Sequence, residues 1–243
     1  HRMLLAGVLC LFGFCLLAQK PIQNRKQKVQ TDTTKVQKAP ATAPQKQPAK
    51  SKVYLIHSDL LRKDSRHPDA QVVVGNVVFR HDSVYMYCDS AYYYDKISSF
   101  EAFSNVKMNQ GDTLFLYGDR LYYDGNTQIA EVRMNVRMEN RNTTLLTDSL
   151  NYDRVYNLGY FFDGGTLMDE QNVLTSEWGQ YNPGTKQSVF NYNVKLVNPQ
   201  FTLTSDTLEY NTASKIANIV GPSDILSDNN HIYSEKGTYN TVT

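Results

Sequence analysis

Seven copies of one short pattern recur through this chain at a nearly constant spacing of 29 or 30 residues. Each copy has an acidic residue, a small residue just before it and an apolar residue three places before it. A leucine or a small residue follows two places after the acid, and in six copies a tyrosine stands four places after it. A fixed period of this length marks a repeat architecture, in which units must stack because none can bury its apolar face alone. The acids are Asp59, Asp89, Asp119, Asp148, Glu177, Asp206 and Glu235.

The residues between these positions are mostly polar, and such alternation is typical of a half-buried β-strand. On a regular strand, however, the apolar residue before the acid would lie on the opposite face from those after it. We therefore expect a bulge or bend at the small–acidic pair, which returns them to one face. The acidic side chain would cap backbone groups that the bend frees, so we predict a structural role for the acids rather than a metal or catalytic one.

Turn residues follow most of the tyrosines, as in Asp124-Gly125-Asn126, and a second strand-like segment follows each turn. Each repeat is therefore predicted to be an antiparallel pair of strands, and the whole domain to be nearly all β. The second segments share an Asn-Val dipeptide, replaced in one repeat by Gly165-Thr166. The dipeptides are Asn76-Val77, Asn105-Val106, Asn135-Val136 and Asn193-Val194.

The first 52 residues differ from the repeats. Residues 1–18 contain an apolar run from Leu4 to Ala18, which is short for a membrane span and predicts a secretory signal peptide, with an uncleaved membrane anchor as the alternative. Residues 19–52 carry nine Lys or Arg against the single Asp32 and almost no large apolar side chain. This composition predicts a disordered, basic Lys/Gln/Pro linker.

Residues 53–243 are predicted to form one domain, which holds 15 Lys or Arg and 23 Asp or Glu. A net acidic domain argues against nucleic acid as a partner. Cys88 is its single cysteine, so no disulfide can form within the domain. The seventh copy stops at Tyr239-Asn240, where a return strand should follow, which predicts a truncated C-terminus or an end that pairs with another molecule.

No arrangement of residues predicts an enzyme, a metal site or a cofactor. His57-Ser58-Asp59 and His81-Asp82-Ser83 place triad-type residues side by side, but neighbours on a strand point to opposite faces. The sequence has no paired-histidine metal motif and no phosphate-binding loop. We expect both histidines to lie on the surface.

Three segments resemble the OstA/LptA superfamily, and the likeness covers nearly all of residues 53–243. They are Gly75-Asn76-Val77-Val78 followed by residues 84–93, Asn105-Val106-Lys107-Met108 followed by residues 114–123, and residues 54–59. Members of this superfamily are periplasmic bridge proteins of lipopolysaccharide export, together with the periplasmic part of the outer-membrane translocon. The chain departs from the family pattern in its richness in tyrosine, in Gly164-Gly165 where Asn is expected, and in its long linker.

The resemblance implies a twisted β-jelly roll, here of about seven repeated antiparallel strand pairs, whose two sheets open as a V around an apolar interior. It implies that this interior binds the acyl chains of lipid A. It further implies a periplasmic protein, associated with the outer membrane, that carries lipopolysaccharide toward that membrane. Its other partners would be jelly-roll components of the same bridge, joined by edge-strand pairing, and further copies of the chain joined end to end.

The repeated leucines and tyrosines would form an apolar stripe along such a roll, because a tyrosine can hold its ring inward and its hydroxyl at a wet rim. Other interpretations are a closed, dry core, a structural or adhesive β-solenoid surface protein without a lipid ligand, and the periplasmic arm of the outer-membrane translocon. The predicted lining consists of Leu116, Leu121, Leu145, Leu150, Leu203 and Leu208, with Tyr123, Tyr152 and Tyr210 near the rim.

Overall fold

The computed structural model describes residues 51–242, which form a unit built almost entirely of β-strands. Residues 1–50, on which the predicted signal peptide and most of the predicted linker fall, and Thr243 lie outside the described residues. Within residues 51–242 the single helical element is the 3-10 turn η1 (Asp95–Ile97), and no helix there is long and apolar enough to cross a membrane. The prediction of an all-β domain is confirmed.

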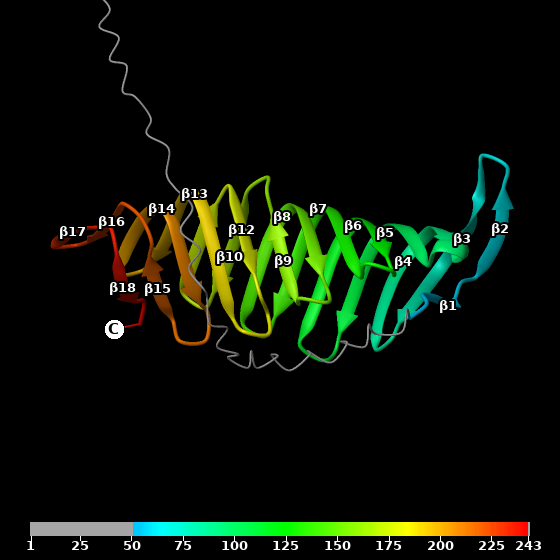
Figure 1. Ribbon diagram of the computed structural model, residues 1–243, viewed down its shortest axis with the longest axis horizontal. Helices are drawn as coiled ribbons and strands as arrows, with labels where there is room; N and C mark the ends of the chain where they lie inside the picture. Colours follow the sequence, from blue (N-terminus) through cyan, green and yellow to red (C-terminus); the bar gives the residue numbers. More distant parts are fainter. Residues whose placement is uncertain (1–50, 243) are drawn as a thin grey trace, which may run out of the picture. The chain divides into compact units, whose positions relative to one another are not determined.

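The strands form an antiparallel meander in which each long strand, continuous or divided into two short ones, pairs with the long strands before and after it in the chain (Figure 1). Eight strands are continuous and 11 to 15 residues long. They are β3 (His67–His81), β4 (Val84–Tyr94), β5 (Ser99–Gln110), β6 (Leu114–Asp124), β7 (Ile129–Asn140), β8 (Thr143–Asp153), β13 (Gln187–Asn198) and β14 (Phe201–Asn211).

Five further strands of similar span are interrupted near their middle, so that each consists of two short strands. The interruptions lie at the same place in the repeat as the register shifts of the continuous strands. The short strands are β1 (Tyr54–His57) with β2 (Leu60–Asp64), β9 (Leu158–Phe161) with β10 (Gly165–Asp169), β11 (Asn172–Ser176) with β12 (Trp178–Tyr181), β15 (Ile216–Ile219) with β16 (Ser223–Ser227), and β17 (Asn230–Ser234) with β18 (Gly237–Asn240).

The continuous strands bend where the sequence predicts a bulge. In β6 the side chains of Leu114 and Leu116 are buried, the acidic residue and its successor are exposed, and Leu121 and Tyr123 are buried again. The pairing of β6 with both neighbours shifts register at this point. The predicted bulge is confirmed, and it brings the apolar positions on both sides of the acid onto one face.

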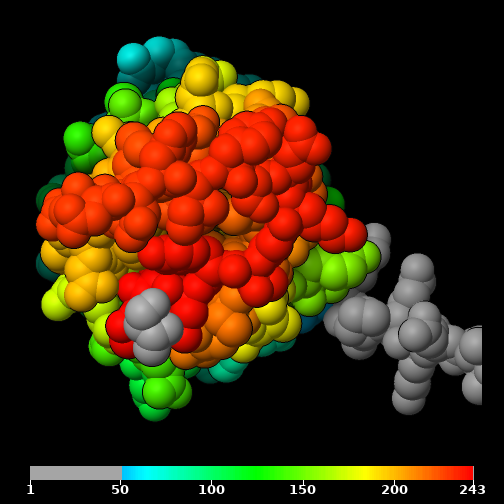
Figure 2. Space-filling model, turned by 90° about the vertical axis from the view of Figure 1, so that its left-hand side faces the viewer, coloured from blue at the N-terminus to red at the C-terminus, as the bar shows by residue number. Residues whose placement is uncertain are grey.

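Because the bends of successive strands line up, they divide the meander into two walls that meet along a spine. Wall A contains residues 114–118 of β6 and the half-strands paired with them, and wall B contains residues 120–124 and the half-strands paired with those. The inner faces pack together, as Phe79 of wall A stacks on Phe100 of wall B with ring centroids 4.0 Å apart. Figure 2 looks onto the end of this roll at which the last strands, in orange and red, lie.

The repeated acids lie exposed along the spine, where asparagine side chains bind four of them. The sequence predicts that the acids cap backbone groups, but the observed partner is Nδ2 of the Asn in the Asn-Val dipeptide on the adjacent strand. These asparagines have φ between 46° and 53°, a left-handed conformation that Asn tolerates better than most residues. The bonds are Asn76–Asp59 (2.9 Å), Asn105–Asp89 (2.7 Å), Asn135–Asp119 (2.5 Å) and Asn193–Glu177 (2.5 Å).

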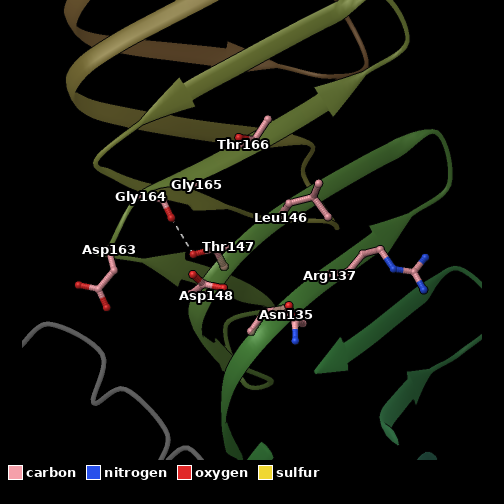
Figure 3. Close-up of a pocket in the computed structure, with 10 residues that line it drawn as sticks. Asn135, Arg137, Leu146, Thr147, Asp148, Asp163, Gly164, Gly165 and Thr166 are labelled. Carbon is pink, nitrogen blue, oxygen red and sulfur yellow. Dashed lines mark hydrogen bonds between the residues drawn. The ribbon is translucent and has the colours of Figure 1, made fainter. Parts of the chain in front are cut away.

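The spine changes where Gly164-Gly165 replaces the Asn-Val dipeptide. Thr147 Oγ1 donates to the carbonyl oxygen of Gly164 at 2.7 Å, a bond drawn as a dashed line in Figure 3. A Cβ at Gly165 would lie 2.6 Å from the ring of Phe161, so this glycine makes room for that ring. The strand is interrupted here between β9 and β10, and an outer pocket of about 500 Å³ lies beside the interruption.

Asn135→Ala is expected to lower the free energy of unfolding by about 1.5–3.5 kcal/mol. The lost hydrogen bond to Asp119 contributes about 0.5–1.5 kcal/mol, and a left-handed alanine costs roughly 1–2 kcal/mol. Asn135→Gly loses the bond but adopts the backbone freely, so its effect should be smaller. Urea denaturation of the two variants measures the difference, and equal losses would contradict the role given to the left-handed backbone.

Candidate functional site

The interior between the walls is one continuous apolar core that extends from Val53 to Ile225. The structure brings the six predicted lining leucines together in it, each at most 2% exposed. The V-shaped opening that the resemblance implies is closed here, because the two walls touch along their margins as well as at the spine. The leucines are Leu116, Leu145 and Leu203 on wall A and Leu121, Leu150 and Leu208 on wall B.

Tyrosines alternate with small residues along the margin of wall B. A small residue on the strand that follows each tyrosine leaves room for the ring, so the four rings in this row are buried, at most 1% exposed. The row runs through Tyr123, Ala130, Tyr152, Gly159, Tyr181, Ser188, Tyr210 and Ala217. The tyrosines predicted near the rim thus have fully buried rings.

The hydroxyls of these tyrosines hydrogen-bond to the margin of wall A, along a line opposite the spine that we call the mouth. Each bond joins residues 41 or 42 positions apart in the sequence. We call these pairs clasps and number them along the chain. They are Tyr123 with His81 Nδ1 (2.6 Å), Tyr152 with Gln110 Nε2 (3.1 Å), Tyr181 with Asn140 Oδ1 (3.1 Å) and Tyr210 with Asp169 Oδ2 (2.7 Å).

The wall-A members of the clasps are not among the predicted site residues, although they recur at the same period as the acids. His81, Gln110, Asn140 and Asp169 are 29 or 30 residues apart, each at the end of its strand. A polar residue at a fixed period, two places from apolar residues of the inner face, was the signal that could have found them. Their side chains are short or planar polar groups that can meet a hydroxyl.

His81 corrects one expectation, because it is fully buried rather than on the surface. Its ring closes the first clasp, where the Tyr123 hydroxyl lies 2.6 Å from Nδ1 and Nη1 of Arg154 lies 3.1 Å from the same nitrogen. Burial, and next the charge of Arg154, lower the pKa of His81, while burial raises the pKa of Tyr123 to about 12. Both groups are therefore neutral near pH 7. His57 is exposed, as predicted.

The fourth clasp contains a buried ion pair. Asp169 is 1% exposed and accepts hydrogen bonds from Tyr210 and from Nζ of Lys215, each at 2.7 Å. Nδ2 of Asn172 lies 2.9 Å from the Tyr210 hydroxyl. Burial, and next the hydrogen bond to Asp169, raise the pKa of Tyr210, so the hydroxyl stays protonated and donates.

Each end of the roll carries an edge strand with one paired side. Strands β1 and β2 pair with β3, whereas β17 pairs with β16 and β18 with β15. Apolar side chains near these edges are about half exposed, including Leu60 (50%) and Leu61 (51%) at one end and Ile232 (48%) at the other. Exposed edges of this kind are templates for pairing with another chain.

Comparison with known proteins gives one family match. A sequence model of the family described as OstA-like protein matches residues 50–206, which include the repeats from Asp59 to Asp206. No curated protein matches the chain. Among solved structures, LptH of Pseudomonas aeruginosa, described as the LptA-homologous periplasmic component of the lipopolysaccharide transport device, is 14% identical, with a TM-score of 0.38. The alignment covers 41% of this chain and 76% of LptH.

Proposed function

The chain belongs to the OstA-like protein family, and we propose that it is a periplasmic protein that binds lipopolysaccharide and carries it toward the outer membrane. The acyl chains of lipid A would lie between the walls, against the leucines of the interior, and the polar headgroup would stay outside the mouth. The observation that carries the proposal is the mouth itself. There a continuous apolar interior is closed by side-chain hydrogen bonds rather than by strand pairing.

Clasps of this kind can open one after another, without unfolding of the domain. One hydrogen bond contributes about 0.5–1.5 kcal/mol net, far less than the roughly 5–15 kcal/mol of a whole domain. Separation of two or three clasps would therefore be a local opening of the native state. The bent strands at the spine would act as the hinge, and acyl chains entering the gap would replace the apolar contacts between the walls.

The ends of the roll would join the chain to its partners in the bridge. An incoming strand from another jelly-roll component, or from a second copy of this chain, would pair with the free side of β1 and β2 or of β17 and β18. The half-exposed Leu60, Leu61 and Ile232 would be covered in such a contact. Interiors of neighbouring rolls would then form one apolar path.

One observation favours a second candidate, a structural β-solenoid without a lipid ligand. The interior of residues 51–242 is packed, with each predicted lining leucine at most 2% exposed. A closed state of a lipid carrier would show the same burial. The two candidates differ in whether the walls separate to admit a ligand.

A photoreactive amino acid at Leu145 or Leu150 is expected to form lipopolysaccharide adducts in cells, and one at Asn151 is not. Leu145 and Leu150 face the interior from opposite walls, whereas Asn151 lies on the outer face beside Tyr160. Immunoblotting against lipopolysaccharide after irradiation detects the adducts. Their absence at all three positions, in a chain that is folded and exported, would overturn the transport function and leave the filled solenoid.

A further inference from the structure

One turn residue at the mouth follows each of the strands β6, β8, β12 and β14, and its charge changes along the roll. These residues occupy equivalent positions 29 residues apart, and all have left-handed backbone conformations. The first two are neutral and the last two are cationic, so the turn row becomes charged toward the C-terminal end of the mouth. The residues are Gln128 (φ 60°), Asn157 (φ 55°), Lys186 (φ 66°) and Lys215 (φ 60°).

The two lysines of this row differ in their partners. Nζ of Lys215 lies 2.7 Å from Asp169 and 3.2 Å from Glu170, so its charge is balanced. Nζ of Lys186 donates to Oδ1 of Asn140, a neutral amide, and no carboxylate of residues 51–242 forms a salt bridge with it. Lys186 is therefore a half-buried cation without a counter-ion in the described part of the chain.

A second cation lies close to Lys186. Arg141, in the turn between β7 and β8, also forms no salt bridge within residues 51–242. Burial, and next the charge of Arg141, lower the pKa of Lys186, while the charge of Asp169 raises it by a smaller amount. The two positive groups therefore act on each other. Two neighbouring cations of this kind favour an anion between them.

Both cations line a cleft of about 220 Å³ outside the third and fourth clasps. Asp169 and Glu170 line the same cleft, but both pair with Lys215. Thr143, another lining residue, stands two places before Leu145 on the inner face of β8. The cleft therefore adjoins the apolar interior at the mouth.

We propose that Lys186 and Arg141 bind a phosphate group of the lipid whose acyl chains occupy the interior, a site that rests on the function proposed above. Arginine binds phosphate with two parallel hydrogen bonds, and a lysine ammonium adds a compact charge. A phosphate in the cleft would supply the counter-ion that Lys186 lacks. It would also draw Lys186 away from Asn140, the wall-A residue of the third clasp. Binding of the headgroup would in this way be coupled to opening of the mouth.

The chain itself supplies a matched variant for the test. Lys186→Asn introduces the residue found at the equivalent position 157, where Asn has nearly the same backbone conformation and hydrogen-bonds its own clasp. The variant should therefore fold, which circular dichroism verifies. Lys195→Asn, at an exposed lysine on the outer face of wall A, is the control for loss of a positive charge.

The test compares binding of the full chain to lipid A with its phosphates and to the same lipid A after enzymatic dephosphorylation, by fluorescence titration. We expect wild type and Lys195→Asn to bind the phosphorylated form about tenfold more tightly, the effect of one charge-assisted contact. Lys186→Asn should lose this preference and keep its affinity for the dephosphorylated form. A preference that survives in Lys186→Asn overturns the site.

Titration with inorganic phosphate, followed by nuclear magnetic resonance, separates the possible sources of the anion. If both lipids bind equally, the lipid-binding function stands and the phosphate site is overturned. If neither lipid binds but inorganic phosphate shifts signals around Lys186 in the wild type and not in Lys186→Asn, the cleft takes free phosphate, and both the lipid site and the lipid-binding function are overturned.

Discussion

Asp169→Ala is expected to lower the free energy of unfolding by about 3 kcal/mol, or roughly 6–12 °C in Tm for a domain of this size. Asp169 is buried and accepts hydrogen bonds from Tyr210 and Lys215. Its removal leaves a largely buried ammonium with the exposed Glu170 as its remaining counter-ion. The Tyr210 hydroxyl also loses its acceptor. Guanidinium denaturation of the variant and the wild type measures the loss.

Asp206→Ala is the matched control for this experiment, because Asp206 is an exposed acid of the spine without an asparagine partner among residues 51–242. Its effect should stay within about 0.5 kcal/mol. The double variant Asp169→Ala/Lys215→Ala should lose less than the sum of the two single variants, since it leaves no unpaired charge. Equal losses in Asp169→Ala and Asp206→Ala would show that the fourth clasp does not stabilise the closed mouth.

The strands and their bends could be predicted from the sequence because both are local. Alternation around Leu116 and Leu121 indicates strands, and the change of parity at Asp119 requires a bulge between them. The face that each leucine presents follows from these two facts. The spacing of residues within one repeat is therefore enough to predict the two walls and the apolar stripe on their inner faces.

The clasps could not be predicted in the same way, because each joins two residues 41 or 42 positions apart on different walls. A repeat shows which residues are equivalent, but not which two rows of equivalent residues meet across the mouth. His81 illustrates the limit, since its neighbours Asp82 and Ser83 are exposed and make the segment resemble a surface turn. The burial of the six leucines was thus predictable, whereas the residue pairs that close the mouth were not.

The partner of the acids was missed for a related reason. Asp119 and Asn135 both stand at periodic positions of the sequence, but their contact depends on the register of β6 against β7. A bend frees backbone groups close to the acid in the chain, and an acidic side chain can cap them. The sequence alone therefore predicts a backbone partner for the acid. The left-handed conformation of Asn135 instead accompanies a contact between its amide and the acid on the next strand.

Gly179 stands at a position where most repeats have leucine, and the sequence alone does not explain the replacement. Four of the seven repeats have leucine at this position, two places after the acid. In the structure a Cβ at Gly179 would lie 2.5 Å from the ring of Phe161 on the paired strand. Phe161 therefore fills the space that leucine occupies in other repeats, and Gly165 makes room for the same ring.

Gly179→Leu is accordingly expected to destabilise the roll by about 3 kcal/mol, the upper range for overpacking a core. Phe161→Val alone should cost about 2–3 kcal/mol, because it leaves a cavity beside the glycine. The double variant Gly179→Leu/Phe161→Val reproduces the Leu150–Val132 pair found one repeat earlier, and it should be more stable than Gly179→Leu alone. Thermal unfolding of the three variants and the wild type completes a double-mutant cycle.

The coupling free energy between the two substitutions distinguishes an interior with a fixed distance between the walls from one whose walls move apart. A recovery of about 2 kcal/mol or more in the double variant would show that the wall-to-wall distance is fixed and that Phe161 and Gly179 share one packed space. Simple addition of the two losses would contradict that account, because walls that move apart at the mouth can accommodate a leucine without removal of the ring. Tight coupling at Gly179, together with adducts at Leu145 and Leu150, would place the hinge at the spine and the movement at the clasps rather than in the core.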